Sequence, residues 1–495
     1  MKLAFIGHDE RYVVEQSLMT LFPGELPVYE PVDPHTDHTW AVITLQENDG
    51  HTCCHVTTQL CVAGKSLTHT LDGTLTGTDY EKEGQRRWAV AASFFQAAHR
   101  LTGIQPPWGM LTGVRPDKPV TQLLGQGKSP EEVHAWMLEH YFVTEERAGL
   151  AMETGTVAHN AANQLKKTDV PVYVGIPFCP TRCVYCSFVS QSVERSFSLV
   201  PPYVDALVAE MQAGGKLLQD LGLTVPAFYM GGGTPTTLTA EQMDRVLTAF
   251  EESFDTSQCS EITVEAGRPD TITEEKLRVM KAHGVTRISV NPQTMEDHVL
   301  RAIGRRHTAR DIVETMELVE KIGFPHVNMD LIAGLPEDTP EGFRRSLDRC
   351  LAFGVHDITV HTLAIKKGSQ ILMEGLSIPG PEAVADMLDY AAPTLRRAGF
   401  APYYLYRQKY MSGSFENIGW CRPGGECWYN VYIMSELSSI LSFGAGGSTK
   451  MVVPGTNQIE RAFNLKYPKE YTERPEKWQA NQQAFADFYQ NRRTF

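Results

Sequence analysis

Three cysteines lie close together at the end of an apolar stretch, in the segment "YVGIPFCPTRCVYCSF". Cys179, Cys183 and Cys186 have the spacing C-x-x-x-C-x-x-C, and closely spaced thiolates are typical metal ligands. A structural zinc site needs four ligands, usually from two separate knuckles, and a second knuckle is missing here, because Cys421 and Cys427 do not have the spacing of one. Zinc is therefore the weaker interpretation, and the neighbouring prolines disfavour three unligated core cysteines.

An iron–sulfur cluster accounts for the odd number of thiols. In a cubane cluster each of the four irons normally takes one thiolate, so three cysteines leave one iron open, as catalytic metal sites do. An open iron can chelate the amino and carboxylate groups of S-adenosyl-L-methionine (SAM), and one electron then splits the sulfonium bond to give a 5′-deoxyadenosyl radical. The spacing therefore predicts a 4Fe–4S cluster and SAM as cofactors.

A glycine triplet gives a second signal. The segment "FYMGGGTPT" places Gly231, Gly232 and Gly233 directly after a short apolar run. Glycine lets the backbone approach a ligand closely, and the exposed N–H and C=O groups can bind its polar ends. Alone the triplet would indicate only a tight turn; after the strand that follows the cysteine loop, it favours a ligand-binding loop.

The elements that position these residues alternate from about residue 170 onward. Helical segments separate six predicted strands, which cover residues 172–177, 227–230, 261–266, 287–290, 326–334 and 357–363. Gly284, Gly323 and Gly354 directly follow predicted helices, where glycine supplies a left-handed cap. Strand–helix repeats imply a parallel sheet with right-handed crossovers, and in such sheets ligands lie at the carboxyl ends of the strands.

The flanking regions differ from this repeat. Before it we expect a first strand at the N-terminus, a hairpin turning at Asn48-Asp49-Gly50, and a helix capped by Ser129 and Glu132. After it we expect a cap that ends in an amphipathic helix. The predicted fold is α/β: a partial (β/α)6 TIM-like barrel at residues 166–400, an N-terminal α+β accessory domain at 1–165, and a mainly helical C-terminal cap on the substrate side at 401–495.

Composition narrows the class of protein. A net charge of −14 argues against nucleic-acid binding, because phosphate contacts need a dense positive surface. No run approaches about 18 apolar residues, so no membrane span is predicted. The N-terminus lacks a cleavable signal pattern, and we predict a cytoplasmic protein whose ten cysteines are thiols or metal ligands.

Taken together, these motifs resemble the radical SAM superfamily, and within it the oxygen-independent coproporphyrinogen III oxidase (dehydrogenase) group, over about residues 170 to 455. The resemblance implies that Tyr173 contacts SAM, that Tyr185 packs against its adenine, and that the "GGGTP" loop binds its amino group. The residues of this loop are Gly232, Gly233 and Thr234.

The resemblance further implies five contacts to the methionine carboxylate, ribose or adenine of SAM. These positions are Glu265, Gln293, Arg305, Asp330 and Ala364. Arg305 suits a carboxylate, whereas Glu265 and Asp330 suit hydroxyls or an ammonium group.

The full pattern is similar to a coproporphyrinogen dehydrogenase-like side branch found in bacteria, and three positions depart from the main enzyme or its relatives. Phe188 stands where the main enzyme has a fourth cysteine, and Gly175 stands where a histidine is common. Both leave the detail of decarboxylation open. Glu416 stands where haem-binding relatives have a histidine, which argues against a haem-ligand role there.

The activity implied by the resemblance is oxidative decarboxylation of coproporphyrinogen III to protoporphyrinogen IX, with a ferredoxin- or flavodoxin-type electron donor. Such a tetrapyrrole carries four carboxylates and needs cationic partners. The candidates are Arg182, Arg306, Lys366, Lys367 and Arg407. Two alternatives keep the cluster: methyl transfer to haem with ring opening or another porphyrin rearrangement, and a haem-binding chaperone without decarboxylase activity.

Overall fold

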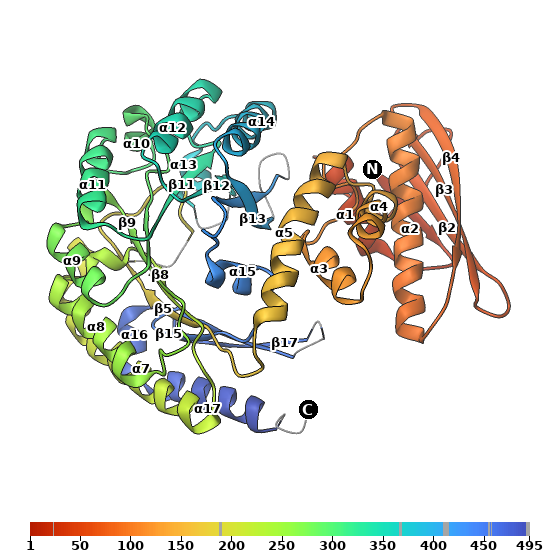
Figure 1. The fold of residues 1–495 in the computed structure, drawn as a ribbon. Helices are drawn as coiled ribbons and strands as arrows, with labels where there is room; N and C mark the ends of the chain where they lie inside the picture. Colours follow the sequence, from red (N-terminus) through yellow and green to blue (C-terminus); the bar gives the residue numbers. More distant parts are fainter. Residues whose placement is uncertain are drawn as a thin grey trace. The chain divides into compact units, whose positions relative to one another are not determined.

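The computed structural model describes residues 1–22, 24–187, 191–365, 369–408, 415–453, 456 and 458–491. The chain forms two compact units, one of Met1–Pro116 with Leu123–Met152 and one of Asp117–Gln122 with Glu153–Phe495 (Figure 1). All cysteines of the motif and all predicted SAM-binding residues belong to the second unit. The expected domain boundaries at 165 and 400 stay a prediction.

The first unit contains a four-stranded sheet in the order β1-β2-β3-β4. Its strands are Lys2–Ile6, Trp40–Glu47, Cys53–Val62 and Lys65–Thr74, and only the β1–β2 pair is parallel. Helices α1 (Arg11–Leu21) and α2 (Asp79–Thr102) bury apolar faces in the core of this unit. The predicted hairpin between β2 and β3 is confirmed. The predicted capping box of Ser129 and Glu132 is also present, at the start of α4 (Pro130–Tyr141).

The second unit is organised around a nine-stranded sheet in the order β13-β14-β12-β11-β10-β9-β8-β5-β15. Its central strands are the six predicted ones: β5 (Val172–Ile176), β8 (Ala227–Gly232), β9 (Glu261–Gly267), β10 (Arg287–Val290), β11 (His326–Ala333) and β12 (Asp357–Thr362). They are neighbours in chain order and all parallel. The expected partial barrel is therefore confirmed.

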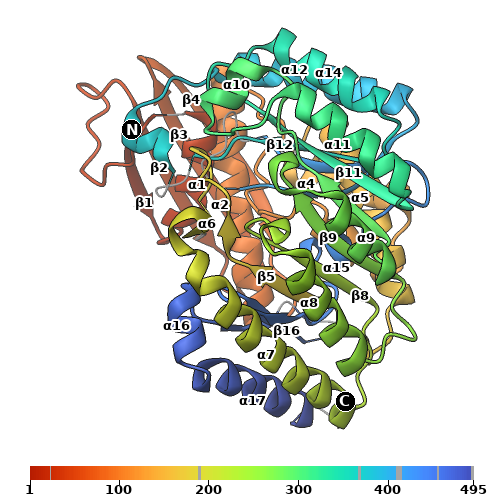
Figure 2. The same ribbon diagram turned by 90° about the vertical axis from the view of Figure 1, so that its left-hand side faces the viewer.

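Helices cover the outer face of this curved sheet, as Figure 2 shows for α7 (Val200–Leu221), α8 (Ala240–Ser253), α9 (Glu274–Ala282), α11 (Ala309–Ile322) and α12 (Pro340–Ala352). Gly323 caps α11 with a left-handed backbone, φ +76°. The helices cover the outer face, so a ligand site is expected at the loops that follow the carboxyl ends of the strands.

The C-terminal region differs from the mainly helical cap expected from the sequence. It contains helices α15 (Trp428–Met434), α16 (Pro468–Glu473) and α17 (Glu476–Gln490), and also five strands, β13 (Ala401–Tyr406), β14 (Asn417–Cys421), β15 (Leu441–Phe443), β16 (Ser448–Val452) and β17 (Ile459–Phe463). Three of these strands extend the main sheet at its edges. Most residues of β13 and β14 are buried, so the two strands lack the apolar–polar alternation that would have marked them. The expected terminal helix is α17, which packs beside α7 (Figure 2).

Within the described ranges, every helix is too short or too polar to span a bilayer.

Candidate functional site

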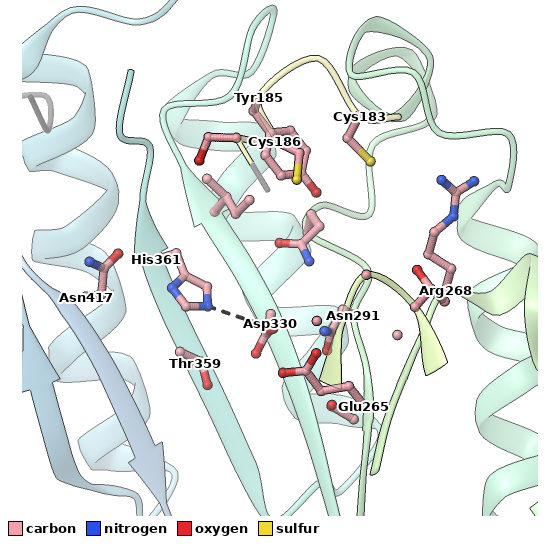
Figure 3. Close-up of a pocket in the computed structure, with 18 of the residues that line it drawn as sticks. Cys183, Tyr185, Cys186, Glu265, Arg268, Asn291, Asp330, Thr359, His361 and Asn417 are labelled. Carbon is pink, nitrogen blue, oxygen red and sulfur yellow. Dashed lines mark ion pairs between the residues drawn. The ribbon is translucent and has the colours of Figure 1, made fainter. Parts of the chain in front are cut away.

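A cavity of about 410 Å³ lies at the carboxyl ends of the central strands, against the cysteine loop (Figure 3). The three cysteines and nine of the predicted SAM-binding residues line it. These nine are Tyr185, Gly232, Gly233, Thr234, Glu265, Gln293, Arg305, Asp330 and Ala364. The structure therefore brings together residues that are separated by up to 185 positions along the chain.

Tyr173 lines a neighbouring cavity of about 390 Å³, which shares Gly232, Gly233 and Glu265 with the first. Its ring stacks on Tyr229, with 6.3 Å between the ring centroids, and Tyr229 itself lines the first cavity. Tyr173 is thus next to the predicted site and does not line the main cavity.

The cysteine loop is joined to the glycine loop by backbone hydrogen bonds. Gly233 N donates to Ile176 O and Thr234 N donates to Phe178 O, both at 2.7 Å. A Cβ atom at Gly233 would lie only 2.5 Å from Phe178 O, so no other residue fits without a shift of the backbone. The Thr234 hydroxyl also donates to Cys179 Sγ at 3.6 Å. The triplet thus allows close contact between two backbones, and its approach to a ligand stays a prediction.

The donor set fits a cluster better than a single ion. All three cysteines line one cavity. Among the residues that the structure describes, however, no three His, Cys, Asp or Glu side chains converge to hold one metal ion. A cluster takes one thiolate per iron, so its ligands need not converge on one point. Cys421 and Cys427 are buried, and burial raises the pKa of both thiols, which does not favour a second metal.

The wall opposite the cysteine loop is polar. Residues at alternate strand positions point to the same face, and Figure 3 shows Glu265, Asn291, Asp330, Thr359 and His361 lining the cavity from four strands or their ends.

Several polar atoms of the cavity lack a protein partner. Asn291 Oδ1, Gln293 Oε1 and Arg305 Nε are buried and make no hydrogen bond within the described part of the chain. Gln293 also has a left-handed backbone, φ +68°, which is uncommon for a residue other than glycine. Buried polar groups without partners are rare in folded proteins, and here they suit a polar ligand.

The two carboxyl groups of the cavity differ in protonation. Burial raises the pKa of Glu265 to about 7, although Tyr229 OH donates a hydrogen bond of 2.5 Å to its Oε1. Burial also raises the pKa of Asp330, but His361 and Asn328 outweigh it and hold this pKa below its usual value. Asn328 Nδ2 donates to Asp330 Oδ1 at 2.8 Å, and His361 Nε2 lies 3.8 Å from Asp330 Oδ2. Asp330 therefore carries a charge, whereas Glu265 titrates near neutrality.

Arg305 is buried behind the cysteine loop. Its Nη1 donates to Asn291 O at 2.5 Å and its Nη2 donates to Tyr185 OH at 3.2 Å. These bonds orient both the guanidinium and the Tyr185 ring at the edge of the cavity.

The candidate cations for a substrate lie in different environments. Arg182 lines the cavity, whereas Arg306 is exposed and pairs with Glu194 at the surface. Arg407 is largely buried, and this burial lowers its pKa to about 10. Lys366, Lys367 and Phe188 lie outside the described residues.

The sequence analysis missed many polar side chains of the cavity, among them Tyr229, Arg268, Asn291, Asn328, Thr359 and His361. The available signal was a polar residue at every second position of an otherwise apolar strand. "HVNMDLIAG" and "DITVHTL" both show it, with Asn328 and Asp330 in the first and Thr359 and His361 in the second. Such residues face inward even though they are polar, because the strand is buried on both sides.

Residues 173–350 match the family model of the radical SAM superfamily. The chain is 38% identical over 481 residues to the oxygen-independent coproporphyrinogen-III oxidase-like protein HemZ of Bacillus subtilis, a match that covers 96% of this chain and 95% of that protein. It is 30% identical over 311 residues to the heme chaperone HemW of Mycobacterium tuberculosis, covering 61% of this chain and 73% of that one.

The solved structure of coproporphyrinogen III oxidase HemN from Escherichia coli has a similar fold, with a TM-score of 0.52 at 23% identity; the match covers 66% of this chain and 72% of that chain. Proteins of the radical SAM superfamily use a 4Fe–4S cluster and SAM, and these are the cofactors predicted from the three cysteines. A relative that matches along almost its whole length shows the branch as well as the superfamily. The chain belongs to the radical SAM superfamily, in the branch of the oxygen-independent coproporphyrinogen-III oxidase-like proteins.

Proposed function

We propose that the protein is an oxidoreductase that converts coproporphyrinogen III to protoporphyrinogen IX by oxidative decarboxylation, a step of porphyrin and haem biosynthesis. One observation carries the proposal. A chain related over nearly its whole length to a coproporphyrinogen-III oxidase-like protein has an open cavity in which three cysteines face a polar wall.

We assign the cofactor contacts to residues of this cavity and its neighbour. Cys179, Cys183 and Cys186 hold the cluster. The glycine loop with Thr234, together with Glu265 and Asp330, binds the amino and hydroxyl groups of SAM, and Arg305 binds its carboxylate. The remaining contacts come from Tyr173, Tyr185, Gln293 and Ala364.

The bound cofactors supply the radical that removes a hydrogen atom from the β-carbon of a propionate. Loss of carbon dioxide, with transfer of one electron to an external one-electron acceptor, would then leave a vinyl group in place of the propionate. The protein's part is to exclude water, to orient the propionate towards the cofactors and to neutralise the carboxylates that do not react. The cations we assign to these carboxylates are Arg182, which lines the cavity, and Arg407, whose chain neighbours Tyr406 and Gln408 line it. The electron that starts the reaction comes from a ferredoxin- or flavodoxin-type donor.

Anaerobic reconstitution with iron and sulfide, followed by assay with SAM, a strong reductant and coproporphyrinogen III, tests the proposal. We expect mass analysis to find products that have lost carbon dioxide and two hydrogens per reacted propionate. Cys186→Ala, treated in parallel, should give none. Deoxyadenosine formed without a changed tetrapyrrole would support the cofactors and contradict the substrate.

A haem chaperone is the second candidate, because part of the chain is 30% identical to the heme chaperone HemW. The histidine of the haem-binding motif is replaced by Glu416, which is 3% exposed and whose main-chain oxygen accepts a hydrogen bond from the Thr362 hydroxyl at 2.9 Å. Stable haem binding without SAM cleavage would support the chaperone. A methylated, ring-opened tetrapyrrole, formed when haem replaces coproporphyrinogen III in the assay, would instead support haem methyl transfer.

A further inference from the structure

A small group of polar residues holds the cysteine loop through hydrogen bonds. Thr181 lies between Cys179 and Cys183, and its hydroxyl accepts a hydrogen bond of 2.7 Å from Arg268 Nη1. The same hydroxyl donates to Gly304 O at 3.1 Å. Arg268 Nη1 also donates to Thr181 O at 3.3 Å. One residue of the loop is thereby tied to two distant segments of the chain.

Arg268 is held in a fixed orientation. It directly follows β9, is 3% exposed, and forms a forked pair with Asp270, at 2.9 Å from Nε to Oδ1 and 2.7 Å from Nη2 to Oδ2. His307 is 4% exposed, and its Nδ1 lies 3.6 Å from Asp270 Oδ1. Burial raises the pKa of Asp270, but His307 and Arg268 outweigh it and keep this pKa well below its usual value. The pair therefore stays ionised, and Nη1 is left to bind Thr181.

The segment around Gly304 holds the other part of the loop. Val184 N donates to Ile303 O at 3.2 Å. Gly304 has a left-handed backbone, φ +76°, and a Cβ atom there would lie 3.4 Å from Arg182 O. The segment can therefore run close to the loop, which is fixed on both sides of Cys183.

We propose that Thr181, Arg268 and Asp270 are positioning residues that hold the cysteine loop for the 4Fe–4S cluster, and that the ion pair sets the charge beside it. Arg268 lines the cavity with the cysteines, and Figure 3 shows it on the side where Cys183 lies. Because the guanidinium is buried, water screens its charge little, and Asp270 is its counter-charge. The inference rests on the cluster of the family and does not depend on the tetrapyrrole substrate.

Two substitutions of Thr181 test the positioning role in the full-length protein, reconstituted without oxygen. Partners behind metal ligands typically contribute about 10–100-fold to metal affinity, so we expect Thr181→Val to lose iron to a chelator about tenfold faster. Thr181→Ser keeps the hydroxyl and should lose iron at the wild-type rate.

Thr286→Val is the matched control. The Thr286 hydroxyl donates to Ile262 O at 3.2 Å and accepts from Ile262 N at 3.0 Å, at the opposite end of the same sheet. Unchanged iron retention in Thr181→Val, or an equal loss in Thr286→Val, overturns the positioning role. Circular dichroism reports whether each variant is folded.

The charge role is tested by the midpoint potential of the cluster, followed by EPR without substrate. Asp270→Asn leaves the guanidinium uncompensated, which favours the more negative reduced cluster, so we expect a more positive potential. Arg268→Met should shift it in the opposite direction. Identical potentials in the wild type and both variants overturn this role. A wild-type chain that takes up no iron overturns the cluster itself, whereas an error in the proposed substrate shows only in the product assay.

Discussion

At the scale of single residues, the cavity contains two kinds of reactive side chain: the three thiols assigned to the cluster, and the carboxyl groups of the polar wall. The three cysteines are predictable because their spacing is local and their side chains have few other uses at that spacing. The missed Asn291 carries no such local signature, and the alternation around His361 marks only the face of its strand. Each becomes part of a site only when its strand is placed beside others.

Removal of one thiol tests the cluster assignment. Cys186→Ala is expected to abolish the visible absorbance and most of the iron of the reconstituted protein, because an iron then lacks its protein ligand. Cys53→Ser, at an exposed cysteine of the first unit, should retain both. Equal iron in the two variants would contradict the assignment.

The protonation of Glu265 predicts a pH dependence of SAM binding. Its pKa is raised to about 7, and an ammonium group binds the ionised form, so each pH unit below this value should weaken binding up to about tenfold. Equilibrium dialysis of the cluster-loaded protein should therefore show that SAM binding strengthens from pH 5.5, about 1.5 units below this pKa, to pH 7.

Glu265→Gln cannot ionise and should bind SAM weakly, with a flatter pH profile. Glu241→Gln, an exposed residue at the start of α8, serves as the control and should follow the wild type. A profile of Glu265→Gln as steep as that of the wild type would assign the dependence to another group.

At the scale of elements, the parallel strand–helix repeat was predictable because periodicity marks its strands and glycine follows several of its helices. The strands β13 and β14 at one end of the sheet were not predictable, since burial on both faces removes their alternation. How the C-terminal region attaches to the barrel is also a tertiary feature. Glu210 on α7 accepts hydrogen bonds from Gly444 N at 2.7 Å, Tyr471 OH at 2.5 Å and Asn464 Nδ2 at 2.7 Å.

This junction predicts a pH-dependent stability. Burial raises the pKa of Glu210 from 4.5 to about 7. The stability that the protonated carboxyl group contributes is therefore present below pH 4.5 and is lost as the pH rises through about 7. The shift corresponds to roughly 3 kcal/mol. The free energy of unfolding is measured with urea on the full chain without cofactors. Between pH 4.5 and pH 8 it should fall in the wild type by about this amount more than it falls in Glu210→Gln. Parallel pH profiles of the two proteins would contradict it.

At the scale of the whole molecule, the chain contains two compact units, and each has its own hydrophobic cluster. Every residue assigned to the cofactors lies in the unit that contains Glu153–Phe495. Ligand binding raises the stability only of the structure that binds it.

Calorimetry of the full chain should therefore show two transitions, and cluster loading should raise the temperature of only one. In Cys186→Ala the same treatment should move neither. A single transition that shifts as a whole on loading would contradict the expectation that the two units unfold separately.

Local spacing along the chain was enough to predict the cysteine loop, the glycine loop, the six parallel strands and the cofactors, because each depends on residues that are neighbours or recur with a short period. The polar wall as a whole, the contact of Arg268 with the cysteine loop and the strands added by the C-terminal region required the folded structure. Their members come from segments far apart, and their contacts exist only after the sheet curves and brings its strand ends to one edge.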